Sequence, residues 1–284
     1  MKNKVKSPLQ KKIEKLIANK LALMGLILVF GITAACIFAP GITKFDPAAI
    51  DYAAILQAPN SEHIMGTDKL GRDVFARILY GGRTSIFIGL ASSLSGALLG
   101  LLMGAIAGYF GGWIDSAFTR LSEIMLTFPN MILILILSAI IGRGVGVLIF
   151  IYAITGWMTP FRMIRNSFLS LREETYVEVA RSFGFSDARI IFNHILPNTI
   201  SPLMVTATTN VATYILSEAG LSFIGVGIPI QIATWGSIMN AAKSIDVVTN
   251  YWWLWLYPGL VLSLFVLAIN FLGDGLRDAF DPKQ

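Results

Sequence analysis

Few side chains in this sequence could do chemistry. The 284 residues include one cysteine, Cys36, and two histidines, His63 and His194, which lie far apart in the chain. A zinc or haem site needs more ligands at close spacing, and a disulfide needs a second cysteine. No Gly-Lys dipeptide occurs, so the sequence has no Walker A loop for the phosphates of ATP. We therefore expect no catalytic residue, no metal and no cofactor site in this chain.

One segment, residues 162–197, has a pattern specific enough to suggest a function. The sequence favours a helix before Gly184, and this glycine then breaks the helix. Ser186 is a good N-cap for a second helix, with Asp187 in its first turn and Pro197 at its end. The apolar side of the second helix is formed by Ile190, Ile191 and Ile195. Two short helices bent at a glycine fit a protein docking site, and they also fit an amphipathic hairpin on a membrane surface.

The composition indicates which elements must position this segment. Hydrophobic residues are 55% of the chain and charged residues are 14%, against about 25% charged in an average soluble protein. The mean hydropathy is +0.69. These values exclude a soluble domain, a disordered chain, a coiled coil and a secreted disulfide scaffold. Although the net charge is +5, such a chain is not a basic nucleic-acid binder, and we expect no nucleic-acid partner.

Six apolar segments are candidates for membrane-spanning helices, since a bilayer core takes about 20 helical residues. They are 21–39, 84–110, 124–141, 147–161, 199–216 and 253–272. None of them contains Asp, Glu, Lys, Arg or His. Pro129 and Pro258 should kink or begin the third and sixth segments. The sequence therefore predicts an all-α polytopic membrane protein with about six transmembrane helices.

The lysines and arginines indicate how these helices are oriented. A run of lysines precedes the first span, and with six crossings most of the 22 basic residues fall on the side of the N-terminus. The positive-inside rule then places both termini in the cytoplasm. Ala34-Ala35-Cys36 resembles a lipoprotein cleavage box, but Thr33 stands where leucine is usual and the apolar run exceeds a typical signal core. We expect three parts: a basic cytoplasmic segment 1–20, a first helix with an outer polar segment 21–83, and a five-helix core 84–284.

Small residues recur at one spacing in the second span. Gly96, Gly100, Gly104 and Gly108 are four residues apart and form one stripe along a helix. Such a stripe lets another helix backbone approach closely in lipid. We favour helix packing for these glycines over the lining of a transport path.

The absence of charge from the spans bears on the mechanism. Carriers coupled to protons or sodium usually bury a charged group at mid-membrane. Glu218 is the nearest candidate, and we place it at the outer end of the fifth span. The absence of such a group disfavours a channel or secondary carrier that acts without ATP. The sequence also contains no nucleophile–base pair, which disfavours a membrane enzyme.

The loop described above resembles the EAA loop of ABC importer permeases. That motif runs Glu-Ala-Ala, three residues, Gly, nine residues, Ile, one residue, Leu-Pro, and this chain matches its spacing from Glu178 to Gly184 and on to Leu196-Pro197. Two positions depart from it. Val179 replaces an alanine, and His194 stands where the general motif has isoleucine.

Other segments narrow the resemblance to the dipeptide/oligopeptide/nickel permease family, on its C-type subunit. They cover 66–73, 217–227 with Trp235-Gly236, 257–259 and 270–278. The resemblance implies an ABC type I importer permease fold in the bacterial or archaeal cell membrane. It also implies a second, B-type permease, two cytoplasmic ATPases that bind ATP and Mg, and an extracellular substrate-binding protein. The implied cargo is di- and oligopeptides, with nickel or another metal chelate, or glutathione, as alternatives.

The same resemblance assigns roles within the loop. Glu178 and Arg181 would make polar contacts with the ATPase, and Ala180 and Phe183 would pack into its groove. Gly184 would permit the bend, since a Cβ there would obstruct close approach. Phe185 completes the expected docking set. The residues that line the substrate path stay unassigned.

The outer polar segment, 46–83, has two possible roles. Its acidic and basic residues nearly cancel, and it could dock the binding protein or shape an outer gate. We favour an interfacial helix from Asp73 onward, packed on the second permease, with Gly66 and Gly71 as turn glycines. The aromatic run 251–257 should form an interfacial belt that anchors the sixth span.

Overall fold

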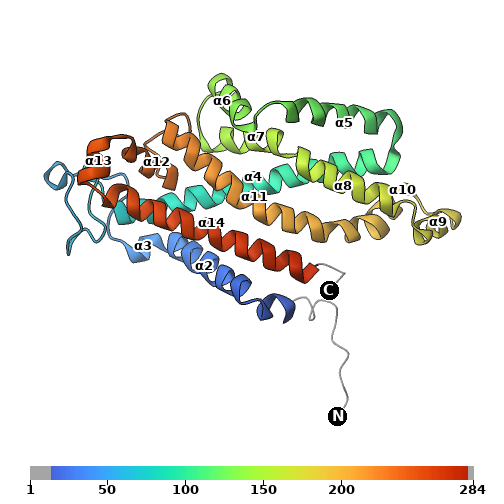
Figure 1. The fold of residues 1–284 in the computed structure, drawn as a ribbon, viewed down its shortest axis with the longest axis horizontal. Helices are drawn as coiled ribbons and strands as arrows, with labels where there is room; N and C mark the ends of the chain where they lie inside the picture. Colours follow the sequence, from blue (N-terminus) through green and yellow to red (C-terminus); the bar gives the residue numbers. More distant parts are fainter. Residues whose placement is uncertain (1–13, 281–284) are drawn as a thin grey trace, which may run out of the picture.

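The computed structural model describes residues 14–280, and these form helices and connecting loops without a β-strand. Figure 1 shows a bundle elongated along four long helices. These are α2 (Lys20–Ile37), α4 (Val74–Phe110), α11 (Leu196–Ile224) and α14 (Trp253–Phe280). Between α4 and α11 lie α5 (Gly112–Thr127), α6 (Asn130–Ile141), α7 (Val145–Gly156), α8 (Met158–Leu171), α9 (Thr175–Ser182), α10 (Asp187–Ile190) and a π-helical turn, Ile191–Ile195. The short elements are α3 (Ala39–Ile42), α12 (Trp235–Met239), α13 (Ile245–Asn250) and the 3-10 turns Tyr52–Ala54 and Asn240–Lys243.

The two ends of the bundle differ in what they hold. The N-terminal end of α2, the C-terminal end of α14 and the loop with α9 and α10 lie toward one end, and α12 and α13 lie at the other (Figure 1). This arrangement agrees with the predicted pairing of both termini with the loop on one side. Most of the basic segment 1–20, and Lys283, lie outside the described residues.

The predicted count of six spans is only partly matched. Three helices, α2, α4 and α14, are long and apolar enough to cross a membrane, and two bent helix pairs raise the number to five. The 29-residue α11 is the predicted fifth span, but it is not among the helices that are apolar enough to cross a membrane. Its middle is too polar, because threonines and Asn210 interrupt the apolar residues. The all-α membrane architecture is confirmed.

Two predicted spans are broken rather than straight. The segment 124–141 is divided between α5 and α6, which meet at an angle of 92° next to Pro129. Proline there has no N–H to continue the helix. The segment 147–161 is divided between α7 and α8, with a bend of 40°. Pro160 lies in the first turn of α8, where proline is tolerated.

The glycine stripe of α4 faces α7 and α8. A Cβ built on Gly100 would come within 2.7 Å of the Phe161 nitrogen, and one on Gly108 within 2.6 Å of the Phe168 Cβ. A Cβ on Gly104 would lie 2.8 Å from the Phe161 carbonyl oxygen, and one on Gly96 would lie 3.4 Å from the Gly156 carbonyl group. These glycines allow the backbone of α4 to approach the backbones of α7 and α8 closely.

The helix α4 begins ten residues before the predicted span, at Val74, because Asp73 caps it. The Asp73 Oδ1 accepts a hydrogen bond from the Ala76 N–H at 2.6 Å. The first turns contain Arg77 and Arg83, which hydropathy alone would leave outside a span. Arg77 donates to the Pro47 carbonyl at 3.1 Å, and Arg83 donates to the Cys36 and Ile37 carbonyls at the end of α2. A helix from Asp73 onward is confirmed, and it is continuous with the membrane helix.

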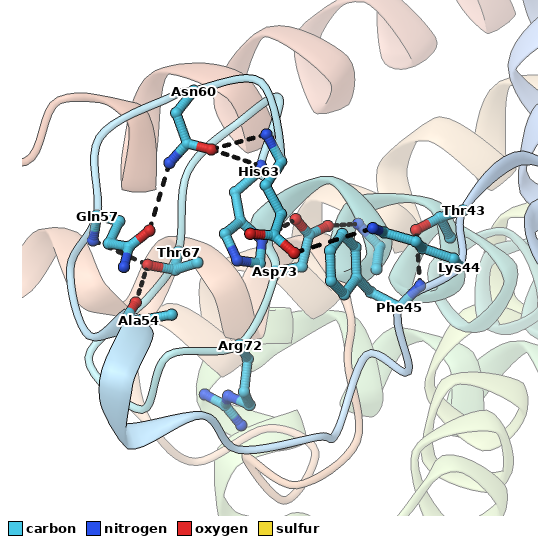
Figure 2. A network of polar contacts seen from close by, with 12 residues as sticks. Thr43, Lys44, Phe45, Ala54, Gln57, Asn60, His63, Thr67, Arg72 and Asp73 are labelled. Atoms are coloured by element: carbon cyan, nitrogen blue, oxygen red, sulfur yellow. Dashed lines mark hydrogen bonds and ion pairs between the residues drawn. The ribbon is translucent and has the colours of Figure 1, made fainter.

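Residues 44–73, which we call the outer cap, fold over the ends of α2 and α14. Gly66 and Gly71 have φ of +72° and +73°, so both are turn glycines as predicted. The Thr67 hydroxyl donates to the Ala54 carbonyl and accepts from the Gln57 N–H, as Figure 2 shows. The indole of Trp253 donates to the Thr67 carbonyl at 3.2 Å. This tryptophan of the predicted aromatic belt is therefore buried under the cap.

A buried pair joins the cap to α4. The His63 Nδ1 lies 2.9 Å from the Asp73 Oδ2, and both side chains are nearly inaccessible. The His63 ring also packs on Phe45, with ring centroids 4.7 Å apart. Asn60 accepts from the backbone N–H of His63 at 2.8 Å (Figure 2). The cap is therefore a folded unit with internal polar contacts.

Glu218 lies near the C-terminal end of α11, and its side chain is fully buried. The reason is that α11 continues to Ile224 and the following loop folds back over it. Its carboxylate accepts hydrogen bonds from the hydroxyls of Ser222 at 2.7 Å, Thr234 at 2.8 Å and Ser85 at 3.3 Å. Ser85 also accepts from the Trp235 N–H. The carboxylate thus joins α4, α11 and the loop before α12.

Candidate docking loop

The turn at Gly184 is set by backbone hydrogen bonds. The Phe185 N–H donates to the Ala180 carbonyl at 3.1 Å, and the Gly184 N–H donates to the Arg181 carbonyl at 2.8 Å. This pair of bonds is the Schellman motif, which needs a left-handed residue after the helix. Gly184 provides it with φ of +73°. The predicted helix break at Gly184 is confirmed.

The second half of the loop differs from the prediction. Ser186 stands at the N-cap position of α10, but its side chain makes no capping hydrogen bond. Asp187 instead accepts a hydrogen bond from the Tyr109 hydroxyl at 2.6 Å. Pro197 does not end the second helix, because the chain runs from α10 through the π turn directly into α11. Pro197 occupies the first turn of α11, where its missing N–H is not needed.

The structure separates the predicted docking residues by exposure. Glu178, Arg181 and Gly184 are exposed, and Phe183 is 76% exposed. A Cβ on Gly184 would meet nothing within 4 Å. Ala180 is 4% exposed and packs inside the chain with Val177 and Ile190. Its side chain therefore supports the loop from within.

Phe185 and His194 explain one departure from the general motif. The two rings stack with centroids 6.0 Å apart and an angle of 18° between their planes. The guanidinium of Arg189 lies 4.1 Å from the centroid of the Phe185 ring. Phe185 is thus half-buried between a histidine and an arginine, a contact that isoleucine in place of His194 would not provide in the same form.

The base of the loop is fixed to the glycine-containing end of α4. The guanidinium of Arg181 lies 5.5 Å from the centroid of the Tyr109 ring. Arg172, directly after α8, donates to the Gly108 carbonyl at 3.3 Å. Arg165 on α8 forms a two-bond ion pair with Asp115 on α5, one bond measuring 2.5 Å. Sequence reasoning missed Tyr109 and Asp115, because 78 and 50 residues separate them from their partners.

The fold and this loop define a membrane transport subunit, and comparison with known proteins agrees. Residues 100–284 match the family described as binding-protein-dependent transport system inner membrane component. The chain belongs to this family. Residues 7–59 match the N-terminal TM domain of oligopeptide transport permease C.

Curated relatives match along nearly the whole chain. A Brucella suis protein provisionally named a peptide permease protein is 42% identical over 97% of this chain and 91% of its own length. The dipeptide transport system permease protein DppC of Alkalihalophilus pseudofirmus is 39% identical over 98% of this chain and 91% of its own. The oligopeptide transport system permease protein OppC of Bacillus subtilis is 36% identical, over 94% and 87% respectively.

Proposed function

We propose that this chain is a permease subunit of an ATP-driven importer that moves di- and oligopeptides into the cell. The names of the relatives support the cargo, and family membership supports a transport subunit rather than an enzyme. The observation that carries the coupling role is the α9–Gly184–α10 turn. It exposes Glu178, Arg181 and Phe183 on a loop whose root is buried in the bundle.

The proposal includes four kinds of partner. A second, B-type permease completes the path, and two cytoplasmic ATPases bind ATP and Mg. A substrate-binding protein delivers cargo from outside. Closure of the ATPases on ATP would move the loop, and the loop would move α11, to which it is directly joined.

The proposed location is the cell membrane, with both termini and the loop in the cytoplasm. The lysines before α2 favour this orientation. The outer cap would then face the binding protein. Labelling tests it: a cysteine at position 143 should react from outside, and one at position 172 only from inside. The reverse pattern would overturn the orientation.

The coupling role is tested in the complete importer reconstituted in liposomes. Gly184→Arg and Glu178→Lys should each abolish peptide uptake and ATPase stimulation while the protein stays inserted. Gly112→Arg is a matched control, because Gly112 has φ of +60° and open space around it on α5, outside the loop. Glu123→Lys, also on α5, controls for charge reversal.

Other outcomes would point to the alternatives. If uptake and stimulation survive both loop variants, the docking assignment is wrong. If the chain forms a transport-competent homo-oligomer without ATPases, it is a channel or secondary carrier. If glutathione or a nickel chelate is taken up and peptides are not, the chain is still an importer subunit, but the proposed cargo is wrong.

A further inference from the structure

A cavity lies where the two broken helices meet α11. Its volume is about 190 Å³. One side is formed by the α5–α6 bend, another by the α7–α8 bend, and the third by the middle of α11. Irregular backbone at membrane depth is tolerated where protein buries it or where it lines a water-filled space. The cavity is open enough for water and occupies such a place.

The cavity is lined by apolar side chains together with uncharged polar ones. Its polar lining consists of Asn130, Thr155, Thr159, Asn210, Thr213 and Tyr214. Within residues 14–280, the amides of Asn130 and Asn210 and the hydroxyl of Thr159 make no hydrogen bond to protein. Asn130 and Thr159 are exposed on this chain and Asn210 is half-buried, and an amide that faces lipid without a hydrogen bond costs about 1–3 kcal/mol by protein mutational data. These groups therefore call for a polar counterpart from outside the chain.

The polar face continues along α11 toward the loop. Thr206 and Thr209 line a second cavity of about 790 Å³, which extends to Asp274 near the end of α14. Positions 206, 209, 210 and 213 fall within about 100° of arc on a helix. One face of α11 thus joins both cavities.

We propose that this face of α11, with Asn130 and Thr159 across the cavity, lines the route of the solute and hydrogen-bonds a peptide backbone. Amides and hydroxyls can both donate to a peptide C=O and accept from a peptide N–H. No lining residue of the mid-helix cavity is charged, so the site distinguishes little between cargo side chains of opposite sign. That the solute is a peptide rests on the proposed function. The position of the route is independent of the identity of the cargo.

Cysteine accessibility in the reconstituted importer tests this route. Cys36→Ala removes the single cysteine of this chain, and the partner subunits are used in cysteine-free form. Asn210→Cys and Thr213→Cys are then treated with a small charged methanethiosulfonate. The matched control is Leu98→Cys on α4. Gly96 and Gly100 pack beside Gly156 and Pro160, and Leu98, between them in the sequence, lies on the opposite side of the helix. Its side chain is 56% exposed there, away from the cavity.

Both path variants should react at least about tenfold faster than Leu98→Cys, since thiols in apolar surroundings stay protonated and unreactive. Labelling at either position should stop peptide uptake, and peptide-loaded binding protein with ATP should slow the labelling. Equal rates at all three positions would overturn the route. So would unchanged uptake after complete labelling.

A second measurement separates a route from a subunit contact. Asn210→Ala should purify with as much second permease as the parent chain. Loss of the second permease from this variant would show that the amide pairs with it, and would overturn the route. If the unlabelled importer takes up no peptide, the cargo proposal fails, while fast hydrophilic labelling at 210 and 213 still supports the route.

Discussion

Gly71 in the outer cap and Gly184 in the docking loop have the same φ, +73°, in opposite surroundings. A Cβ on Gly71 would lie 1.7 Å from the Asp51 carbonyl oxygen, whereas one on Gly184 would meet nothing within 4 Å. One buried polar pair also distinguishes the cap from the loop. His63 and Asp73 are buried in the cap, while Glu178 and Arg181 are exposed in the loop. The turn at Gly71 is thus enclosed by this chain, whereas the turn at Gly184 has open space around it.

The largest expected effect on stability comes from exchanging Gly71 for alanine, and Gly184→Ala is its comparison. Gly71→Ala should lower the free energy of unfolding by about 4 kcal/mol, from left-handed strain and overpacking together. Gly184→Ala introduces only the left-handed backbone strain and should lower the free energy of unfolding by about 1 kcal/mol. It should nevertheless impair coupling. Thermal unfolding of the purified importer in detergent measures the first effect and ATPase stimulation the second. Equal losses of stability would contradict the comparison.

A second prediction concerns the buried carboxylate of Glu218. Glu218→Ala leaves the hydroxyls of Ser85, Ser222 and Thr234 without their acceptor, and should cost about 3 kcal/mol. Glu218→Gln keeps the side-chain volume and one acceptor oxygen, so its loss should be about 1 kcal/mol. Thermal unfolding of both variants checks the order. A Gln variant as unstable as the Ala variant would show that the charge itself is required.

A third prediction compares two capping aspartates within the cap. Asp73→Ala removes the cap of α4 and the partner of His63, and should cost about 2 kcal/mol. Asp51→Ala removes an exposed bond to the Ala53 N–H, and should cost less than about 1 kcal/mol. The same thermal measurement applies to both. Indistinguishable shifts would mean that burial of the His63–Asp73 pair adds nothing.

The smallest effect is expected at the root of the loop. Tyr109→Phe removes the hydrogen bond to Asp187 and should cost about 1 kcal/mol. The change should appear as faster amide hydrogen exchange over residues 175–195. Tyr176→Phe is the control, because the hydroxyl of Tyr176 has only a 3.5 Å contact with Asn198. Unchanged exchange in Tyr109→Phe would show that apolar packing alone holds the loop.

Local signals in the sequence were sufficient for several features. Gly184 ends a helix because of its own backbone freedom, and the α4 glycines pack because of their spacing. The bend of 92° at Pro129 could not be predicted, since proline permits a range of angles and the neighbouring helices choose one. Nor could the burial of Ala180, since the hydrophobic cluster that contains it includes residues of α4 and α11, which are distant in the sequence. The continuity of the helix from Asp73 with the second span was missed, because the bonds that accommodate Arg77 and Arg83 come from distant backbone carbonyls.

The π turn at Ile191–Ile195 fixes the rotational phase of α11. A π turn holds an extra residue in the hydrogen-bond ladder, and one residue corresponds to about 100° around a helix. The direction in which Asn210 and Thr213 point is therefore offset from the one that an unbroken α-helix from Asp187 would give. Since α11 is roughly 44 Å long at its 29 residues, a tilt of a few degrees at this turn would also be amplified into a displacement of several ångströms at the far end.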